Sequence, residues 1–255
     1  TRCRRFGKSM AAKMLCAYYD KSCDSRELFR GLKAEKDRSF ETYLNKYYVI
    51  WVDMTDFTTR FRREKEIVKI MQNKIINDIL SEFPQISRQD DDDLMEILYR
   101  ISESTDERFV MIIDEWDAIL REMGTDEYIT TSYVDLLRRL FKGSGSNTVF
   151  AGAYLTGILP IKRYNTESAL NNFREYTMIN PGKMATSLGV THKEVEELCS
   201  NFGMDIKEME RWYDGYRIGD ESHIFNPYSV MRAIDDNRYQ SYWTTTSAYD
   251  SVITY

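Results

Sequence analysis

A short apolar run that ends in two carboxylates constrains the fold of this chain more than any other segment. Residues 109–113 (Phe-Val-Met-Ile-Ile) are all apolar, and Asp114 and Glu115 follow directly. An uninterrupted apolar run of this length predicts a strand that is buried on both faces. Such strands occur in parallel sheets covered by helices, and acidic side chains at their carboxyl ends can bind Mg²⁺ or polarise water.

Other strands and helices alternate with this run over the first 180 residues. The predicted strands are 47–52, 148–155 and, as a candidate fourth strand, 175–179. One predicted helix begins after Ser9, and the other predicted helices are 64–83, 90–101 and 133–141. Because strands alternate with helices, we expect the α/β class, with a mostly parallel sheet covered on both faces.

The beginning of the chain carries a second motif, in which cations precede a helical pattern. Residues 5–9 (Arg-Phe-Gly-Lys-Ser) match the Gly-Lys-Ser end of a phosphate-binding loop. Gly7 allows the backbone to approach an anion, and the free N–H groups at a helix start attract one. Lys8 is therefore a candidate ligand of the β- and γ-phosphates, and the hydroxyl of Ser9 is a candidate ligand of Mg²⁺.

Each motif alone has a simpler interpretation. The first glycine of the loop pattern G-x-x-x-x-G-K-[ST] would fall at position 2 of this chain, but that residue is Arg2. The segment therefore also fits a solvated basic terminus. Two acids after a strand also occur as an ordinary strand exit. Together the motifs predict a nucleotide site, because one binds phosphates and the other binds Mg²⁺ and orients water.

The predicted site has three groups of residues. The catalytic residues are Glu115, which polarises the attacking water, and Lys8. The nucleotide contacts are Arg5, Phe6, Gly7, Lys8, Ser9, Met10 and Thr156, and the Mg²⁺ ligands are Ser9 and Asp114. The predicted cofactors are ATP and Mg²⁺.

Further polar residues stand near predicted strand ends or helix starts. Thr156 either senses the γ-phosphate or the attacking water, or bonds to nearby backbone, and Asp53 follows an outer strand in a similar position. Asp117 is expected to cap a helix. His192 and His223 are assigned no chemistry. The acidic run 90–93 is expected at the start of a helix, where carboxylates favour the dipole, with a Mg²⁺ site as the alternative.

Beyond residue 182 the pattern changes to short helices. Thr191 with Glu194 forms a capping box, and Asn226-Pro227 fits a helix start. The aromatic segment 212–216 fits a local core, with base stacking as the alternative. We therefore expect two domains, a core at 1–182 and a small helical lid at 183–255. The chain begins inside the loop, so we expect a fragment that lacks the first strand.

Charge and hydropathy exclude several classes of protein. The net charge is −6, whereas non-specific binding to nucleic acid usually requires a basic surplus. No run approaches the about 18 apolar residues of a membrane span, and no signal-peptide pattern opens the chain. The four cysteines form no C-x-x-C pair. We expect a cytoplasmic protein with no membrane partner, and the oligomeric state stays open.

Several segments in order resemble the predicted AAA-ATPase-like family of bacterial proteins. The N-terminal segment resembles the T-R-P-R-R-F-G-K-[ST] loop of that family, with Cys3 in place of Pro, so the loop lacks a fixed φ. Residues 112–117 resemble its apolar-D-E-[YW]-D motif. The other matches are L-T-G-I at 155–158, S-A-L-N-N-F at 168–173, W-Y-D-G-Y at 212–216 and, with Phe225 at its first position, Y-N-P-[WFY]-S-V at 225–230.

This resemblance implies a P-loop NTPase-like three-layer sandwich that binds ATP and hydrolyses it with Mg²⁺, coupled to an unknown partner. The family is often joined to a nuclease-like domain of the PD-(D/E)XK superfamily, which is therefore a candidate partner in the parent protein. A second hypothesis is a nucleotide-gated interaction module with negligible hydrolysis, in which the lid moves on binding.

Overall fold

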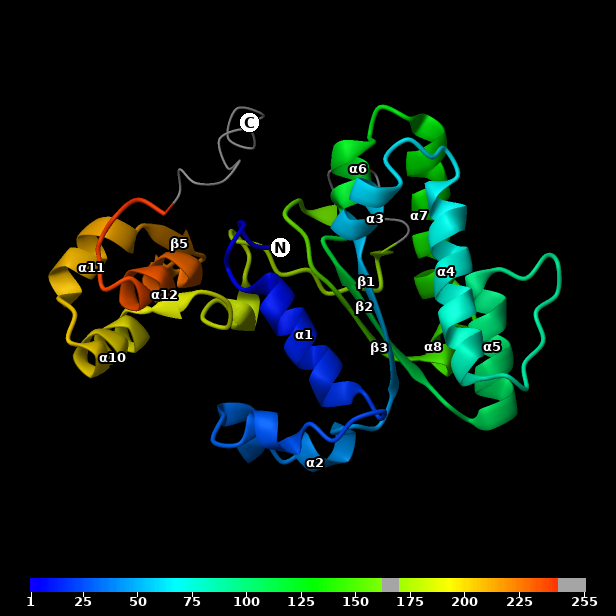
Figure 1. The fold of residues 1–255 in the computed structure, drawn as a ribbon, viewed down its shortest axis with the longest axis horizontal. Helices are drawn as coiled ribbons and strands as arrows, with labels where there is room; N and C mark the ends of the chain where they lie inside the picture. The colour runs from blue at the N-terminus through cyan, green and yellow to red at the C-terminus, as the bar shows by residue number, and fades with distance from the viewer. Residues whose placement is uncertain (162–169, 243–255) are drawn as a thin grey trace. The chain divides into compact units, whose positions relative to one another are not determined.

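The structure is a computed structural model that describes residues 1–161 and 170–242 (Figure 1). Contacts divide the chain into two compact units: Ser9–Arg174, and Thr1–Lys8 together with Glu175–Tyr255. The domains predicted at 1–182 and 183–255 stay a prediction, and the compact units divide the chain at different positions. Ser168 and Ala169, which belong to one of the family motifs, lie outside the described residues.

A parallel sheet forms the centre of the unit Ser9–Arg174 (Figure 1). Its strands are β1 (Tyr48–Asp53), β2 (Phe109–Asp114) and β3 (Phe150–Leu155), in the order β1-β2-β3. All residues of β2 are buried, as its apolar run predicts. Asp53 is paired in register with Asp114, and Ile113 with Leu155, so the three carboxyl ends meet at one edge. The predicted α/β class with a parallel sheet is confirmed.

Alternate residues of β2 contact helices on opposite faces of the sheet. Phe109, Met111 and Ile113 belong to a large apolar cluster with the helices α4, α5 and α7. Val110 and Ile112 pack instead with residues of helix α1. The bounds of these helices are α1 Lys8–Tyr19, α4 Ile67–Glu82, α5 Leu94–Thr105 and α7 Glu127–Lys142. Helices therefore cover both faces, as period-two alternation in a doubly buried strand requires.

Helix α1 runs in the direction opposite to the strands. Its last residue, Tyr19, accepts a 2.9 Å hydrogen bond from the amide of Tyr47, which directly precedes β1. The 12 residues of α1 span about 18 Å at 1.5 Å each, and the 6 residues of β1 span about 20 Å. The start of α1 at Ser9 therefore lies level with the carboxyl edge of the sheet.

Shorter elements connect the strands to these helices. Asp53 caps α3, because its carboxylate accepts from the amides of Thr55 and Asp56. Asp93 caps α5 in a capping box with Glu96, which confirms the cap predicted for the acidic run. The short elements are η1 Arg26–Phe29, η2 Lys33–Lys36, α2 Phe40–Tyr43, α3 Met54–Arg60, α6 Ala118–Glu122 and α8 Ser146–Val149.

The second unit contains helices and also a small antiparallel sheet, in the order β4-β6-β5. Its elements are η4 Gly182–Met184, β4 Val190–Thr191, α10 His192–Phe202, α11 Ile206–Tyr213, β5 Tyr216–Ile218, β6 Glu221–Phe225 and α12 Pro227–Asp235. The helix starts predicted at Thr191 and Asn226 are confirmed. The sequence did not predict the strands of this sheet, because strands of two to five residues are too short to show a period.

The fourth strand predicted at 175–179 is not formed. Two carbonyl groups of this segment bond to the N-terminal residues, and that of Met178 accepts from Gly219 N at 2.9 Å. The amino group of Thr1 donates to Tyr176 O at 2.5 Å, and Arg2 Nη1 donates to Thr177 O at 2.9 Å. Ile179, at the end of the segment predicted as a strand, is 92% exposed. None of the described helices combines the length and the apolar content that a membrane crossing requires.

Candidate functional site

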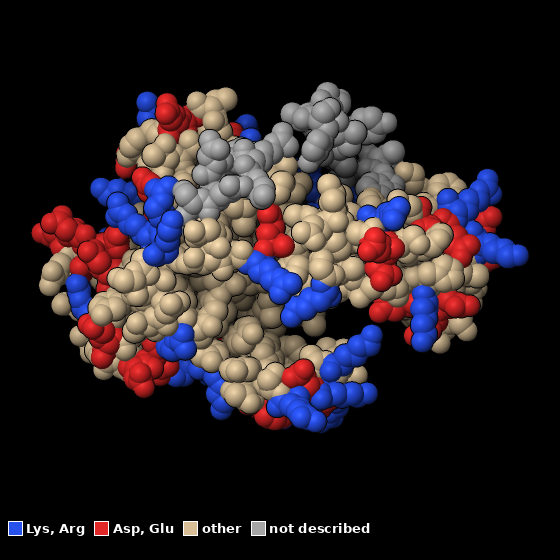
Figure 2. Space-filling view, turned by 180° about the vertical axis from the view of Figure 1, so that it is seen from behind, with Lys and Arg blue, Asp and Glu red and all other residues tan. Residues whose placement is uncertain are grey.

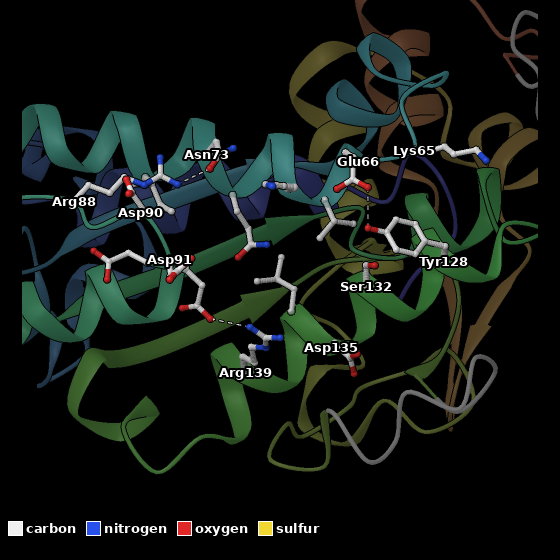
Figure 3. Close-up of a pocket in the computed structure, with 17 residues that line it drawn as sticks. Lys65, Glu66, Asn73, Arg88, Asp90, Asp91, Tyr128, Ser132, Asp135 and Arg139 are labelled. Atoms are coloured by element: carbon white, nitrogen blue, oxygen red, sulfur yellow. Dashed lines mark hydrogen bonds and ion pairs between the residues drawn. The ribbon is translucent and has the colours of Figure 1, made fainter.

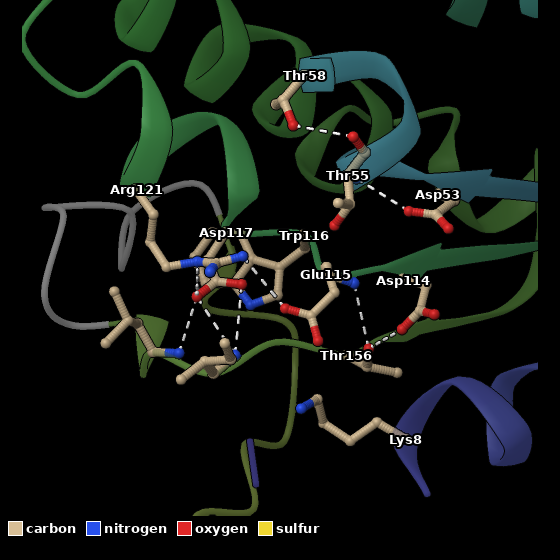
Figure 4. A network of polar contacts seen from close by, with 12 residues as sticks. Lys8, Asp53, Thr55, Thr58, Asp114, Glu115, Trp116, Asp117, Arg121 and Thr156 are labelled. Atoms are coloured by element: carbon tan, nitrogen blue, oxygen red, sulfur yellow. Dashed lines mark hydrogen bonds and ion pairs between the residues drawn. The ribbon is translucent and has the colours of Figure 1, made fainter. Parts of the chain in front are cut away.

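The ends of β2 and β3 are joined by hydrogen bonds that involve Asp114, Glu115 and Thr156 (Figure 4). The hydroxyl of Thr156 donates to the carboxylate of Asp114, and the same oxygen accepts from the amide of Glu115 at 3.2 Å. The backbone of Thr156 also bonds on both sides, to Ile113 O at 2.9 Å and from Trp116 N at 2.8 Å. Asp114 and Thr156 are 2% and 3% exposed. The structure thus brings together three of the predicted site residues.

Glu115 lies in the turn that leaves β2, and its backbone is in the left-handed region. Its φ is +51°, which a residue with a side chain rarely adopts. Its Oε2 accepts a hydrogen bond from Arg121 Nη2 at 3.2 Å, and its carbonyl accepts from Ala118 N at 2.8 Å. Sequence reasoning missed Arg121, because one arginine in a short helix carries no pattern that marks it.

Asp117 is the N-cap residue of α6, directly before Ala118, but its side chain makes no capping hydrogen bond. Its carboxylate accepts from Leu159 N at 2.9 Å and from Ile158 N at 3.3 Å, and it lies 3.2 Å from Arg121 Nε. Asp117 is completely buried. The predicted cap is therefore corrected: this carboxylate binds the backbone amides that follow β3 and not those of its own helix.

Close packing also fixes the turn after β2. A Cβ on Gly157 would lie 2.6 Å from the ring of Trp116 and 2.8 Å from Asp117 Oδ1, so only glycine fits here. The hydroxyl of Tyr133 donates to Trp116 O at 2.8 Å. Burial, followed by the nearby charge of Asp117, raises the pKa of Tyr133, so this phenol stays protonated and keeps donating. The turn after β2 is therefore held in one conformation.

The cations of Thr1–Lys8 bond to backbone carbonyls within their own unit. Arg2 is 2% exposed, and it donates to Thr177 O at 2.9 Å and to Met184 O at 2.7 Å. Lys8 Nζ donates to the carbonyls of Arg2 and Cys3 at 3.1 and 3.2 Å. Carbonyl oxygens are neutral acceptors, so a phosphate that carries full charge can replace them around an ammonium group.

Arg5 and Phe6 are anchored to the same unit. Arg5 Nη1 donates to Tyr242 O at 2.6 Å, and the guanidinium lies 4.3 Å from the centre of the Tyr228 ring. The side chain of Phe6 is buried and meets the ring of Tyr216 edge to face at 4.8 Å. At Phe6, only the backbone is therefore placed for the predicted nucleotide contact.

The remaining predicted contacts lie at the start of α1. Gly7 has φ +80°, and nothing lies within 4 Å of the position of a Cβ there. Ser9 is exposed, Met10 is 64% exposed, and the first turn of α1 contains no acidic residue. The amides at this helix start therefore meet no carboxylate from their own turn, which is the arrangement that favours an external anion.

A cavity of about 510 Å³ lies elsewhere in the unit Ser9–Arg174 (Figure 3). It is lined by α4, α7 and the acidic run, and none of the predicted site residues lines it. Several of its polar groups bond to one another, such as Tyr128 with Glu66 at 2.8 Å and Arg139 with Asp93 at 3.1 Å. Within the described residues no group of three His, Cys, Asp or Glu side chains is placed to hold a metal ion. The alternative of a Mg²⁺ site at the acidic run stays a prediction.

The histidines and the aromatic segment 212–216 have local partners. The hydrogen bond that His223 Nδ1 makes to the carboxylate of Asp214, followed by the charge of that carboxylate, raises the pKa of His223. His192 pairs with Glu210. Tyr213 is buried and its hydroxyl donates to Gln240 O at 2.9 Å, which fits the local-core interpretation of this segment. On the face drawn in Figure 2, acidic and basic side chains of the described residues lie among one another.

Comparison with known proteins identifies the family. Residues 1–166 match the family model described as Predicted AAA-ATPase. The chain belongs to this family. It is also 25% identical, over 251 residues, to a protein of Azotobacter chroococcum mcd 1 described as "Uncharacterized protein in vnfD 5'region". That match covers 96% of this chain and 46% of the relative, so the chain spans about half the length of that protein. No solved structure matches the chain. Membership of the Predicted AAA-ATPase family indicates nucleotide binding.

Proposed function

We propose that this chain binds ATP with Mg²⁺ and hydrolyses it, and that the hydrolysis is coupled to a partner. The observation that supports this most is the bonded group of Asp114, Glu115 and Thr156 at the carboxyl edge of the sheet. Ligands of open α/β sheets bind outside this edge. The exposed start of α1 at Ser9 lies level with the same edge, as its length and its bond to Tyr47 indicate.

The donor groups fit a magnesium triphosphate. Mg²⁺ prefers hydroxyl and carboxylate oxygens and keeps several waters, and the candidates here are the hydroxyl of Ser9 and the carboxylate of Asp114. In this proposal Lys8 and the amides around Gly7 hold the phosphates, and Arg5 adds charge. The metal ion, when bound, neutralises charge that develops on the phosphate oxygens.

Glu115 would accept a proton from the attacking water. Its carboxylate follows the buried Asp114 directly, and the hydrogen bond between its amide and Thr156 fixes the turn that presents it. Thr156 bonds to both acids, so a change in the position of Asp114 is transmitted to the backbone of Glu115. This link supports the role predicted for Thr156 as a sensor at the γ-phosphate.

One observation favours a second candidate function. The carboxylate of Glu115 accepts from Arg121, so one of its oxygens is already engaged by a guanidinium. A nucleotide-gated interaction module with negligible hydrolysis is compatible with this pair. In either case we propose a nuclease-like domain in the parent protein as one candidate partner.

Single-turnover hydrolysis compared with a binding isotherm separates the two functions. We expect Glu115→Gln to bind ATP as the wild type does and to turn it over about 100-fold more slowly, the typical worth of a general base. Glu122→Gln is the matched control, because Glu122 is an exposed glutamate on α6. Equal turnover by the wild type and Glu115→Gln would remove Glu115 from the mechanism and favour the binding module.

A further inference from the structure

We infer that Arg121 is a positioning residue for Glu115, an inference that rests on the proposed hydrolysis. Arg121 lies on α6, and its guanidinium stands between the carboxylates of Glu115 and Asp117 (Figure 4). Neither of the two motifs that predicted the site contains this residue. Its role follows from which atoms it contacts and from how those atoms are held.

The guanidinium contacts the two carboxylates at the same distance. Nη2 lies 3.2 Å from Glu115 Oε2, and Nε lies 3.2 Å from Asp117 Oδ2. The side chains of Arg121 and Glu115 are 18% and 19% exposed, and that of Asp117 is fully buried. Solvent screens such charges weakly, so the position of the guanidinium strongly affects the orientation of the Glu115 carboxylate.

Asp117 is the partner of Arg121 whose position is fixed by the backbone. Its carboxylate is bonded to the amides of Ile158 and Leu159, which follow β3. Arg121 is one helical turn further along from Asp117, the spacing at which side chains on a helix meet. Arg121 therefore transmits the position of the segment after β3 to the side chain of Glu115.

The backbone of Glu115 needs such support. A left-handed φ in a residue other than glycine persists only where the surroundings determine it. Thr156 and Ala118 bond to the backbone of Glu115, while Arg121 bonds to its side chain. Without Arg121 the turn keeps its backbone bonds, but the carboxylate loses the guanidinium contact that orients it.

The test compares Arg121→Met, Arg121→Lys and the matched control Arg138→Met in single-turnover ATP hydrolysis. Arg138 is an arginine on α7 that pairs with Asp135 at an exposed position. We expect R121M to lower the turnover rate about tenfold and to leave the ATP dissociation constant within twofold of the wild type. R121K should recover part of the rate, because lysine keeps the charge but lacks the planar fork. R138M should match the wild type.

A double variant separates positioning from a general structural effect. If Arg121 acts through Glu115, R121M combined with Glu115→Gln turns over no more slowly than Glu115→Gln alone. Binding stoichiometry of ATP gives the folded fraction of each variant, so a loss of folded protein is not counted as slow turnover. Wild-type turnover by R121M, or a further tenfold loss in the double variant, would overturn the inference. Equal turnover by the wild type and Glu115→Gln would instead remove Glu115 from the mechanism, and no turnover by the wild type would remove the proposed hydrolysis. Either result removes this inference as well.

Discussion

The two charged regions of the chain, the acidic ends of β2 and β3 and the cationic segment Thr1–Lys8, use their charges in different ways. At the strand ends, Asp114 bonds to the hydroxyl of Thr156, and Asp117 to backbone amides and Arg121. In the cationic segment, Arg2 bonds to backbone carbonyls of its own unit. The acidic group is a network of side chains fixed by a sheet, whereas the arginine is an anchor for the segment that carries it.

This difference changes how the loop of cations is interpreted. The sequence alone presents four cations that repel one another until an anion binds. The structure shows that Arg2 is buried against carbonyls and that Arg5 bonds to Tyr242 O. Among the predicted phosphate contacts, Lys8 and the backbone at Gly7 are therefore stronger candidates than the arginines are.

The largest effect on stability is expected from Asp117→Ala. This change leaves the amides of Ile158 and Leu159 without their acceptor and removes one carboxylate from the partly buried Arg121. Breaking a buried charged contact of this kind costs about 3 kcal/mol. Urea denaturation of Asp117→Ala and of its control measures the free energy of unfolding of each variant.

The control for that change is Asp135→Ala, which removes an exposed ion pair. The side chain of Arg138 in this pair is 44% exposed and that of Asp135 is 46% exposed. Exposed pairs contribute less than about 1 kcal/mol. If Asp117→Ala were no more destabilising than Asp135→Ala, the acidic region would not be the fixed network described above.

A smaller effect is expected from Arg2→Ala, which tests the other region. Arg2 donates to the carbonyls of Thr177 and Met184 from a buried position, so its loss should destabilise the protein by about 2 kcal/mol. Arg4→Ala is the matched control, because Arg4 is exposed, and its loss should cost less than about 0.5 kcal/mol. Equal effects in thermal denaturation would contradict the distinction between an anchor and a solvent-exposed cation.

Strong periodicity made the core of the sheet predictable. The strand expected at 47–52 is β1, and the run at 109–113 is β2, whose alternate residues pack on opposite faces. The helix after Ser9 is α1. The grouping of Asp114 with Thr156 also followed from the sequence, because the carboxyl ends of neighbouring parallel strands meet at one edge.

Contacts between distant segments decided what the sequence did not predict. The segment 175–179 reads as a strand, but its carbonyls accept from Thr1 and Arg2, which are more than 170 residues away. The small sheet β4-β6-β5 has strands too short for a period. Asp117 reads as a cap, since the amides after β3 that bind it cannot be inferred from local spacing.

Calorimetric titration of the wild type and Lys8→Ala with magnesium ATP tests the central claim most directly. Lys8 opens α1, and the claim is that its ammonium group exchanges the carbonyls of Arg2 and Cys3 for phosphate. Lys13→Ala, in the same helix at an exposed position, is the control. The account predicts binding by the wild type and Lys13→Ala, and no measurable binding by Lys8→Ala. Unchanged affinity in Lys8→Ala, or no binding of ATP by the wild type, would contradict it.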